Sequence, residues 1–514
     1  MVHTSLESLF FSCVIGVSKS LFPDLTLENQ AVEVPEMKIF SRFVLILALA
    51  AFVWPIHVRA QSATSYILQS PSLAAAQAAC ETYGFTMVST VHSPDTYLVA
   101  TSSSYTLSQI TAWTQGDPNV KYIDLNHQFT VPESTKLATV SAPTIPLTTY
   151  VTNSNAVSLY GSSVWEGYLQ QPAYYSTNAY VFMTQLQPLS LLVPSTSNGN
   201  KASSQLVVVA VIDSGIDNLN PVLKPYVIPG YDFTRNVAGY ASDIADLNQS
   251  TAAILEQSTA AILEQYQVAV LNQSTAAILE QTTVASLGTN ALPAYFGHGT
   301  MTAGLVHLVA PNTQLMPLKA FAADGTGSEA NIIQAIYYAV AHGAKVINMS
   351  FELPQVTDAL LKAINYAARN GVVCVASAGN NANTALVYPA GFGNVVSVAS
   401  VNSLGQQSTF SNYGPDLVQM AAPGEGLITT YPGRHYAQVS GTSFSAALVS
   451  GSVALLIELN TNGTTSQLKV GDFQRAFSHA ATCGTNGSLG SGCLDVNQAV
   501  TFIRQLSLPP APLN

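Results

Sequence analysis

The chain has 514 residues, of which 48% are hydrophobic and only 9% are charged, so its polar character rests mainly on Ser, Thr, Asn and Gln. This length accommodates one large domain with a smaller one, or two to three domains, and the apolar content suffices for a sizeable core. A formal net charge of −11 and the lack of a basic cluster exclude nucleic acid as an expected partner.

A predicted export signal begins at Met37. Lys38 and Arg42 form its positively charged part, and residues 43–53 form an apolar segment that is too short to span a bilayer. Small residues just before Gln61 favour cleavage at that point. The sequence therefore predicts a secreted protein, extracellular or periplasmic, with no membrane association after the signal is removed.

The position of this signal is unusual, because signal peptides do not normally begin so far into a chain. We therefore expect translation to start at Met37. Residues 1–36 are then a mis-assigned start, and residues 37–60 are the signal peptide. The alternative is an internal membrane anchor at this position.

Residues 61–130 are typical of a small α+β unit. The segments SYILQ and TYLVAT predict strands, with an Ala-rich helical pattern at 72–83 between them, and VKYIDLN predicts a later strand. Residues 131–205 are rich in Ser, Thr and Pro with a few aromatic patches, which indicates a linker and a lead-in segment.

From residue 206 to about 504, apolar runs alternate with amphipathic patterns. Strands are predicted at 206–215, 315–321, 345–351, 372–380 and 395–401, and helices at 329–343 and 357–371. This alternation predicts an α/β fold in which helices cover both faces of a parallel sheet. Ligands in such sheets bind at the carboxyl ends of the strands, so polar residues just after the apolar runs are the candidates for a site.

An insertion at 247–281 interrupts this alternation. The octamer STAAILEQ occurs at 250–257, 258–265 and 274–281, and its Ala, Leu, Glu and Gln residues favour helix. The favoured interpretation is a tolerated surface insertion, either helical or disordered. A substrate gate or an adhesive arm is the alternative.

The cysteines suggest one disulfide. Cys483 and Cys493 flank a loop rich in Gly, Ser and Asn, and in an exported protein such a pair favours a disulfide. Cys374 lies in an apolar strand pattern and is expected to be a buried thiol. No Cys and His spacing suggests a zinc site.

Three residues in the α/β region carry reactive groups beside small residues. Asp213 ends the first buried strand in VIDSG, His298 lies in GHGT before an apolar helical run, and Ser443 lies in SGTSF before another. Each alone has an ordinary explanation, and a serine at a helix start is usually an N-cap. Together they are the nucleophile, the base and the orienting carboxylate that acyl transfer needs.

These motifs, in the order Asp, His, Ser, resemble the subtilisin family of serine proteases between residues 207 and 500. A fourth motif, VASAGNN, resembles the oxyanion segment of the family, with Asn380 as the side-chain donor. The resemblance implies a serine endopeptidase that acts through an acyl-enzyme. The related sedolisin branch uses Glu and Asp where this chain has His298 and Asn380, so these two residues argue against it.

The resemblance also explains why Ser443 should begin a helix. Its backbone N–H and the positive end of the helix then face the developing oxyanion, and Asn380 supplies a second donor. Loss of such a donor costs roughly 3–4 kcal/mol of transition-state stabilisation, a magnitude known from subtilisin itself.

Two further segments resemble the substrate-binding walls of the family. The first is an edge strand that contains Gly325, Thr326 and Gly327, and it pairs with an extended peptide. The second contains Ser350, Phe351 and Glu352. The family usually has glycine where this chain has Glu352. A carboxylate there favours basic or polar substrate side chains if it faces the substrate, but we expect it to point to solvent.

Other departures concern stability and metal binding. Ala447 replaces a proline usual in the family, which should cost about 0.4–1 kcal/mol of stability. Met301 replaces a second histidine that the reaction does not need. The strongest calcium loop of the family is absent after His298, so no metal or other cofactor is predicted, although calcium elsewhere is not excluded.

Residues 61–130 resemble, more weakly, the inhibitor propeptide of the family. The resemblance implies a zymogen that folds on its propeptide, cleaves itself within residues 131–205 and then acts as a monomer on protein or peptide substrates. A catalytically inactive binding or adhesive protein is the alternative, because of the repeats and the low charge. The intact set of Asp213, His298, Ser443 and Asn380 argues against it.

Overall fold

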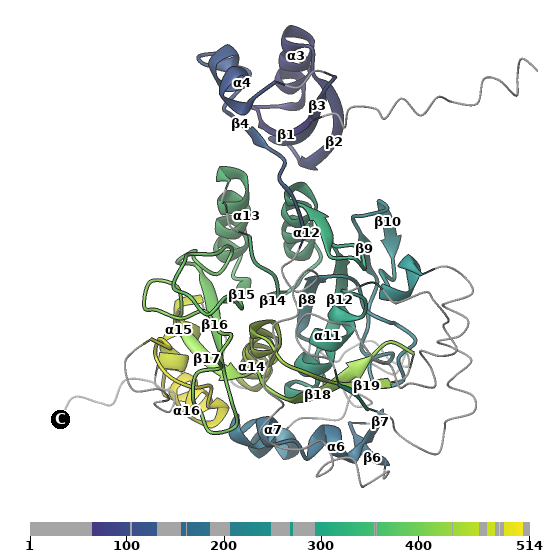
Figure 1. Cartoon of the computed structure of the whole chain (residues 1–514), viewed down its shortest axis with the longest axis vertical. Helices are drawn as coiled ribbons and strands as arrows, with labels where there is room; N and C mark the ends of the chain where they lie inside the picture. Colours follow the sequence, from purple (N-terminus) through teal and green to yellow (C-terminus); the bar gives the residue numbers. More distant parts are fainter. Residues whose placement is uncertain are drawn as a thin grey trace, which may run out of the picture. The chain divides into compact units, whose positions relative to one another are not determined.

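The computed structural model describes most of the chain after residue 63 (Figure 1). The described residues are 64–102, 105–130, 156–160, 162–185, 206–247, 268–270, 293, 295–353, 355, 357–433, 435–461, 470–478, 483 and 488–506. The predicted false start, the signal peptide and the three octamers lie outside these residues. All the described residues belong to one compact unit, 63–514.

A four-stranded antiparallel sheet and two helices form the predicted small α+β unit. The strand order is β2-β3-β1-β4, with β1 (Thr64–Gln69), β2 (Thr86–His92), β3 (Thr96–Thr101) and β4 (Tyr122–Leu125). Helix α3 (Leu73–Tyr83) begins at its N-cap Ser72 and ends at Gly84, whose φ of 70° suits a glycine. Helix α4 (Leu107–Thr114) begins with a capping box between Thr106 and Gln109.

The large sheet has eight strands in the order β10-β9-β12-β8-β14-β15-β16-β17. All neighbours from β9 to β17 are parallel, and only the edge strand β10 is antiparallel. The strands are β8 (Val208–Asp213), β9 (Gly230–Asp232), β10 (Val237–Gly239), β12 (Gln314–Lys319), β14 (Val346–Met349), β15 (Val373–Ser377), β16 (Val395–Val401) and β17 (Met420–Pro423). The predicted α/β fold class is therefore confirmed.

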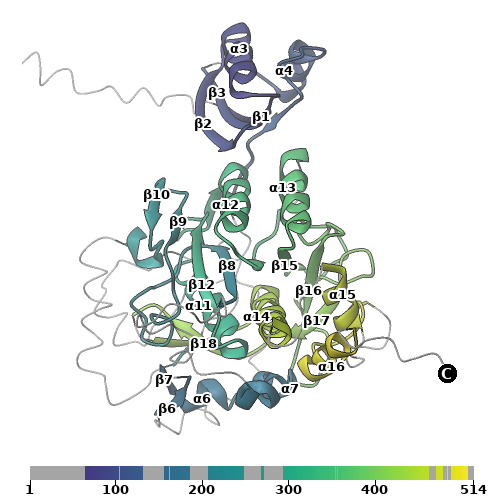
Figure 2. The same cartoon turned by 180° about the vertical axis from the view of Figure 1, so that it is seen from behind.

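Helices cover both faces of this sheet (Figure 2). Helices α11 (His298–Val309) and α14 (Thr442–Thr461) contribute to one hydrophobic core, and α12 (Glu329–Ala341) and α13 (Asp358–Arg369) contribute to the other. Val209 and Val211 of β8 lie in the first core, whereas Val208, Ala210 and Ile212 lie in the second. Because both faces of β8 are buried, its sequence is a continuous apolar run.

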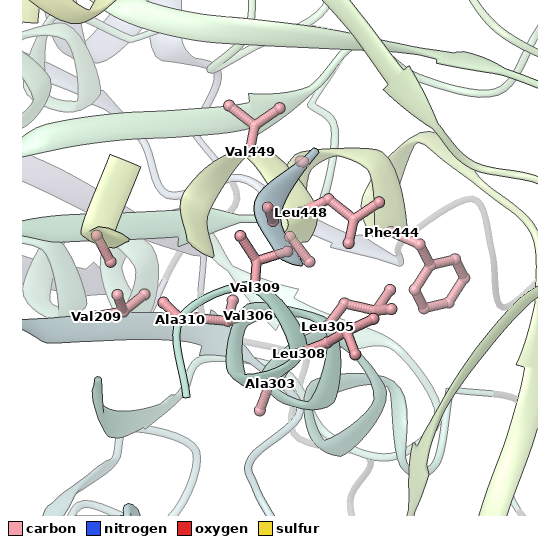
Figure 3. Packing of buried hydrophobic residues seen from close by; sticks show 14 of the residues in the cluster. Val209, Ala303, Leu305, Val306, Leu308, Val309, Ala310, Phe444, Leu448 and Val449 are labelled. Atoms are coloured by element: carbon pink, nitrogen blue, oxygen red, sulfur yellow. The ribbon is translucent and has the colours of Figure 1, made fainter. Parts of the chain in front are cut away.

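Helix α14 is the central helix of the first core. Among the described helices it is the one long and apolar enough to cross a membrane, but 83% of its apolar window is buried inside the molecule. Figure 3 shows Leu448 of α14 near side chains of α11 such as Val306 and Val309, whereas Val449 points away from α11. The apolar character of α14 therefore reflects burial in a protein core.

Part of the predicted linker at 131–205 is folded into this core. A hairpin of β6 (Ala156–Leu159) and β7 (Ser162–Trp165) is followed by α6 (Glu166–Leu169), α7 (Pro172–Ser176) and a 3₁₀ helix, η2 (Ala179–Gln185). Trp165 and Tyr168 are almost fully buried, and the Tyr168 hydroxyl donates a hydrogen bond to the carbonyl of Gly304 in α11. Scattered aromatic residues can anchor a segment without producing a strand or helix periodicity.

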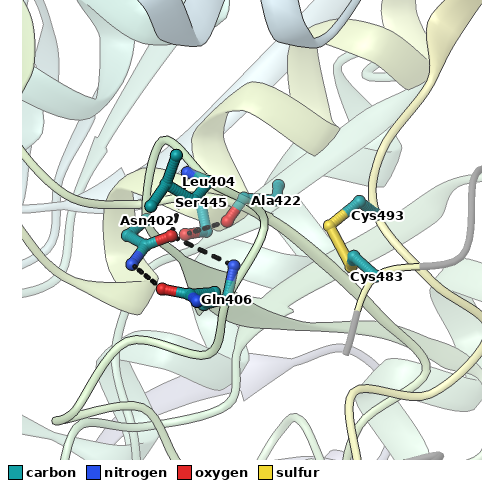
Figure 4. The surroundings of a disulfide bond; sticks show 7 residues. All are labelled: Asn402, Leu404, Gln406, Ala422, Ser445, Cys483 and Cys493. Atoms are coloured by element: carbon teal, nitrogen blue, oxygen red, sulfur yellow. Dashed lines mark hydrogen bonds between the residues drawn. A yellow bond between two sulfur atoms is a disulfide. The ribbon is translucent and has the colours of Figure 1, made fainter. Parts of the chain in front are cut away.

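The large domain has several smaller features. Strands β18 (Leu427–Tyr431) and β19 (His435–Val439) form an antiparallel pair, and β11 (Val268–Val270) from the repeat insertion adds to β19 in parallel. Cys483 and Cys493 form a disulfide with a Cα–Cα distance of 5.3 Å (Figure 4). Cys374 is a fully buried free thiol in β15, as expected. Helices α15 (Val470–Ser478) and α16 (Val496–Leu506) end the described chain.

Candidate active site

Asp213 lies at the carboxyl end of β8, between β12 and β14 in the sheet. Its side chain is fully buried, and Oδ1 accepts a hydrogen bond from the backbone N–H of Ser214 at 2.7 Å. Gly215, two residues on, has a φ of 109°, and a Cβ there would lie 2.8 Å from backbone atoms of residues 241–243. The chain therefore turns away from the strand at a point that only glycine accommodates.

His298 is the first residue of α11, and its ring faces Asp213. Nδ1 lies 2.8 Å from Oδ1 and 2.9 Å from Oδ2 of the carboxylate. Because a carboxylate only accepts, this contact places a proton on Nδ1 and makes Nε2 the nitrogen that accepts a proton. The imidazole is 4% exposed and stacks on the ring of Tyr295 with 4.3 Å between centroids.

The glycine that follows His298 permits this close approach. A Cβ on Gly299 would lie 2.0 Å from the carbonyl oxygen of Gly215. The start of α11 thus touches the turn after β8, which explains why small residues flank both side chains in the sequence. Asp213 and His298 are brought together as the sequence predicted.

Ser443 is the second residue of α14, so it is not the N-cap that precedes the helix. The side chain is 1% exposed, and its hydroxyl lies 3.3 Å from the carbonyl of Ser350. The next residue, Phe444, has its ring 5.4 Å from the His298 ring (centroid to centroid), and Figure 3 shows Phe444 above α11. The N-terminal ends of α11 and α14 therefore meet at one place.

Asn380 follows β15 and is oriented by Thr442. Its Oδ1 accepts hydrogen bonds from the Thr442 backbone N–H at 2.9 Å and from the Thr442 hydroxyl at 2.8 Å. Because the amide oxygen is held in this way, the Nδ2 group is the end of the side chain available as a donor. The first turn of α14 and the Asn380 amide thus supply donors in the same region of the site.

The predicted edge strand is β13 (Thr326–Ser328), which begins after a turn at Gly325 with a φ of 83°. It pairs antiparallel with β5 (Gln128–Thr130), the last described strand before residue 131. Gly327 lies opposite Phe129 in this ladder. A Cβ on Gly327 would lie 2.8 Å from the Phe321 ring, so the residue must be small. The strand therefore accepts an extended peptide segment.

The opposite wall differs in part from the sequence expectation. Ser350 donates its hydroxyl hydrogen to the carbonyl of Ser443 at 2.8 Å, and Phe351 is fully buried with its ring 5.0 Å from that of Phe321. The expectation that Glu352 points to solvent is wrong, because the residue is only 7% exposed.

Glu352 is turned inward toward the segment that contains Asn380. Its Oε1 accepts a hydrogen bond from the Asn381 side-chain amide at 2.7 Å, and its Oε2 lies 1.9 Å from the point where a Cβ on Gly379 would be. The missing side chain of Gly379, whose φ is 98°, creates the space for the carboxylate. Neither residue spacing nor composition predicts that a glycine in one loop makes room for a carboxylate from another loop.

Sequence reasoning missed two buried charged residues next to Asp213. Asp243 is fully buried and accepts hydrogen bonds from Ser214 and Thr300, and its burial raises the pKa to about 7. Lys319 at the end of β12 is fully buried, and its Nζ donates to the carbonyls of Ser214 and Phe321 and to Asp246. Two features of the sequence could have indicated these residues. Lys319 is a charged residue at the end of an apolar strand, and Asp243 forms an acidic pair with Asp246 in a chain with few charges.

Comparison with known proteins places these features in a wider context. A family model described as the subtilase family matches residues 204–492. A thermophilic serine proteinase from Bacillus sp. (strain AK1) is 33% identical over 254 residues, which cover 49% of this chain and 53% of that protein. Subtilisin BL from Lederbergia lenta is 32% identical over 212 residues, which cover 40% of this chain and 77% of that protein.

Subtilisin DY from Bacillus licheniformis is 33% identical over 216 residues, which cover 40% of this chain and 77% of that protein. This chain thus spans about half the length of the thermophilic proteinase and about three quarters of the two subtilisins. A solved lanthipeptide protease matches with a TM-score of 0.45 and 24% identity, over 58% of this chain and 87% of that protein.

Proposed function

Since this chain belongs to the subtilase family of serine proteases, we propose that it is a secreted endopeptidase that is made as a self-processing zymogen. The observation that carries the proposal is the contact between Asp213 and His298 at the N-terminal end of α11, where the N-terminal end of α14 brings Ser443 alongside. The intact set of residues disfavours an inactive binding protein.

In the proposed reaction, the Ser443 hydroxyl oxygen attacks the carbonyl carbon of a peptide bond, and His298 Nε2 takes up the hydroxyl proton. Asp213 keeps the other proton of the ring on Nδ1 and stabilises the imidazolium. The imidazolium then gives its proton to the leaving amine, which departs as the C–N bond breaks and leaves an acyl group on Ser443. Water, deprotonated by the same ring, hydrolyses this ester and regenerates the hydroxyl.

The oxyanion of each tetrahedral intermediate is stabilised by two proposed donors. One is the Asn380 Nδ2 group, whose orientation follows from the two hydrogen bonds that Thr442 makes to Oδ1. The other is the backbone N–H of Ser443 at the positive end of α14. Both donors are in place before the reaction, so little reorganisation is needed when the charge develops.

The proposed substrate is an extended protein or peptide segment that adds to β13. The pairing of β5 with β13 supports this, because it demonstrates that the strand accepts an antiparallel neighbour. In the zymogen, residues 61–130 would act as the intramolecular inhibitor that occupies this edge. The Glu352 carboxylate would favour a substrate with a basic side chain before the scissile bond. The proposed reaction assigns no role to a metal.

Wild-type protein, expressed from Met37, and the Ser443→Ala variant test this proposal. A fluorophosphonate probe should label the wild type alone, and casein hydrolysis should fall by at least about 10⁴-fold in the variant. A wild-type protein that is folded but neither labels nor hydrolyses would instead support the inactive binding protein. Equal hydrolysis by both proteins would point to a contaminating protease.

A further inference from the structure

Asp243 holds three polar groups with one buried carboxylate. It begins the 3₁₀ helix η3 (Asp243–Asp246) and is fully buried. Its Oδ1 accepts the Ser214 hydroxyl at 2.5 Å, and its Oδ2 accepts the Thr300 backbone N–H at 3.2 Å and also the Thr300 hydroxyl. The Ser214 oxygen in turn accepts the backbone N–H of Gly299 at 3.0 Å.

These partners directly follow the two residues of the proposed charge pair. Ser214 comes after Asp213, whereas Gly299 and Thr300 come after His298. The carboxylate of Asp243 therefore fixes the turn at the end of β8 to the first turn of α11. The His298 ring contacts Asp213 across this same junction, so a change in one segment relative to the other alters the Nδ1 contact.

The position of Asp243 in the chain adds a second argument. Asp243 and Thr300 are separated by 57 residues, and the repeat insertion lies between them. The Thr300 to Asp243 hydrogen bonds thus join the segment before the insertion to the segment after it. Because the entropic cost of closing a loop grows only slowly with its length, a long insertion between two joined ends adds little to the cost of holding them together.

Charged groups around Asp243 come from several elements. Burial is the main cause of its raised pKa, the positive charge of Lys319 and the hydrogen bonds from Ser214 and Thr300 lower it, and the negative charge of Asp213 raises it. Burial raises the pKa of the Tyr431 hydroxyl in β18, and the negative charge of Asp243 raises it further. Asp243 and Asp213 are therefore close enough to influence each other electrostatically.

We infer that Asp243 is a positioning residue for the proposed reaction, because it keeps the ends of β8 and α11 in the register that the Asp213–His298 contact requires and adds a negative charge that favours the imidazolium. The inference rests on the proposed peptidase function. Asp243 touches neither the substrate nor the reacting atoms in this account. It acts through Ser214, Gly299 and Thr300 and through its charge.

Asp243→Asn tests this role. The variant keeps the size of the side chain and one acceptor oxygen but removes the charge. Its amide NH₂ group would also face a Ser214 or Thr300 group that donates to Asp243 in the wild type. Glu458→Gln is the matched control, since Glu458 is a partly buried carboxylate of α14 that accepts the Asn312 amide at 3.0 Å, far along the helix from Ser443. Each protein is assayed on a peptide ester, with active sites counted by titration.

Per active site, Asp243→Asn should lower kcat by about tenfold or more with KM within about twofold. The pH at which half the activity is lost on the acidic side should also move down, by less than about 0.5 unit, because Asp243, with a pKa of about 7, is only partly charged there in the wild type and the variant is neutral. Glu458→Gln should change neither quantity. If kcat and the acidic side of the profile stay unchanged while only the melting temperature falls, Asp243 is merely structural and the inference is wrong.

A second set of variants serves if Asp243→Asn does not fold. Ser214→Ala and Thr300→Val each remove one partner of the carboxylate and should each lower kcat per active site by several-fold, whereas unchanged kcat in both would overturn the inference.

The low-field ¹H NMR signal of the His298 Nδ1 proton in Ser443→Ala provides a readout without activity, and it should shift or broaden when Asp243→Asn is added. A wild-type protein that fails to label contradicts the proposed function first, whereas an active wild type with an unchanged signal contradicts only the role of Asp243.

Discussion

Gly299 and Gly379 each leave out a side chain for which the site has no room. The carbonyl of Gly215 occupies the first place and the Glu352 carboxylate occupies the second. These glycines are needed for close packing between segments that are distant in sequence. The sequence indicates that such positions exist near Asp213 and His298, but it does not indicate what fills the space.

Glu352 offers a test of substrate preference at the level of one residue. Glu352→Gln keeps the shape of the side chain and an acceptor for Asn381 but removes a buried negative charge beside the substrate wall. We expect the ratio of kcat/KM for a peptide with Lys before the scissile bond to that for one with Phe to fall by about tenfold, as the loss of a charge-assisted contact implies. An unchanged ratio would show that the carboxylate only supports the Asn381 loop.

Single residues also show where sequence reasoning ends. Asp213, His298, Ser443 and Asn380 were predicted because each follows an apolar run beside small residues in a recognisable motif. Asp243 was not, because its partners lie 29 and 57 residues away and carry no local pattern. Long-range hydrogen bonds of this kind become visible only when the fold brings the segments together.

At the level of elements, α11 is unusual because every one of its residues is buried. The helix therefore lacks an amphipathic pattern, and its apolar run alone predicted it. One consequence is that His307, in the last turn, is fully buried with its ring 4.4 Å from that of Tyr226. Among the described residues, neither ring nitrogen of His307 has a hydrogen-bond partner.

The buried His307 should make the folded protein less stable in acid. Burial lowers the pKa of His307 to about 3 in the folded state, whereas the unfolded chain binds the proton near pH 6.5. The unfolded state therefore binds more protons between these values, and stability falls as the pH drops below about 6.5. From pH 8 to pH 4.5 this single group should lower the free energy of unfolding by about 3 kcal/mol.

His307→Leu should remove that contribution. In the Ser443→Ala background, which prevents self-digestion, urea unfolding at pH 8 and pH 4.5 gives the loss of stability for the parent and for the variant. At pH 8 the histidine is neutral in both the folded and the unfolded state. The difference in the free energy of unfolding between parent and variant at this pH therefore reports the change in packing alone. A variant that loses as much stability as its parent between the two pH values would rule out His307 as a source of acid sensitivity.

At the scale of the whole molecule, the small α+β unit contacts the large domain through several specific interactions. Asp95 forms an ion pair with Lys362 of α13 at 2.5 Å, and His92 stacks on Tyr337 of α12 with 3.5 Å between centroids. The side-chain oxygen of Asn126 accepts a hydrogen bond from the backbone N–H of Ala330, in the first turn of α12, at 3.0 Å. Together with the β5–β13 pairing, these contacts are what the proposed inhibitor role of residues 61–130 requires.

The α/β architecture of the large domain was predictable because apolar strand patterns alternate with amphipathic helical patterns from residue 206 onward. The boundary between them was less predictable. Residues 156–182 read as part of a linker, yet Trp165 and Tyr168 pack in the same core as α11 and α14. Since this segment belongs to the folded large domain, self-cleavage is expected before it, within residues 131–155.

Intact mass and N-terminal sequencing of the wild type and of Ser443→Ala, both expressed from Met37, would show whether Ser443 cleaves its own chain. The account predicts that the wild type loses the segment that ends before the new N-terminus, located between residues 131 and 155, whereas the variant keeps it. If both proteins keep the segment, or if both lose it, Ser443 does not cleave its own chain and the self-processing zymogen is contradicted.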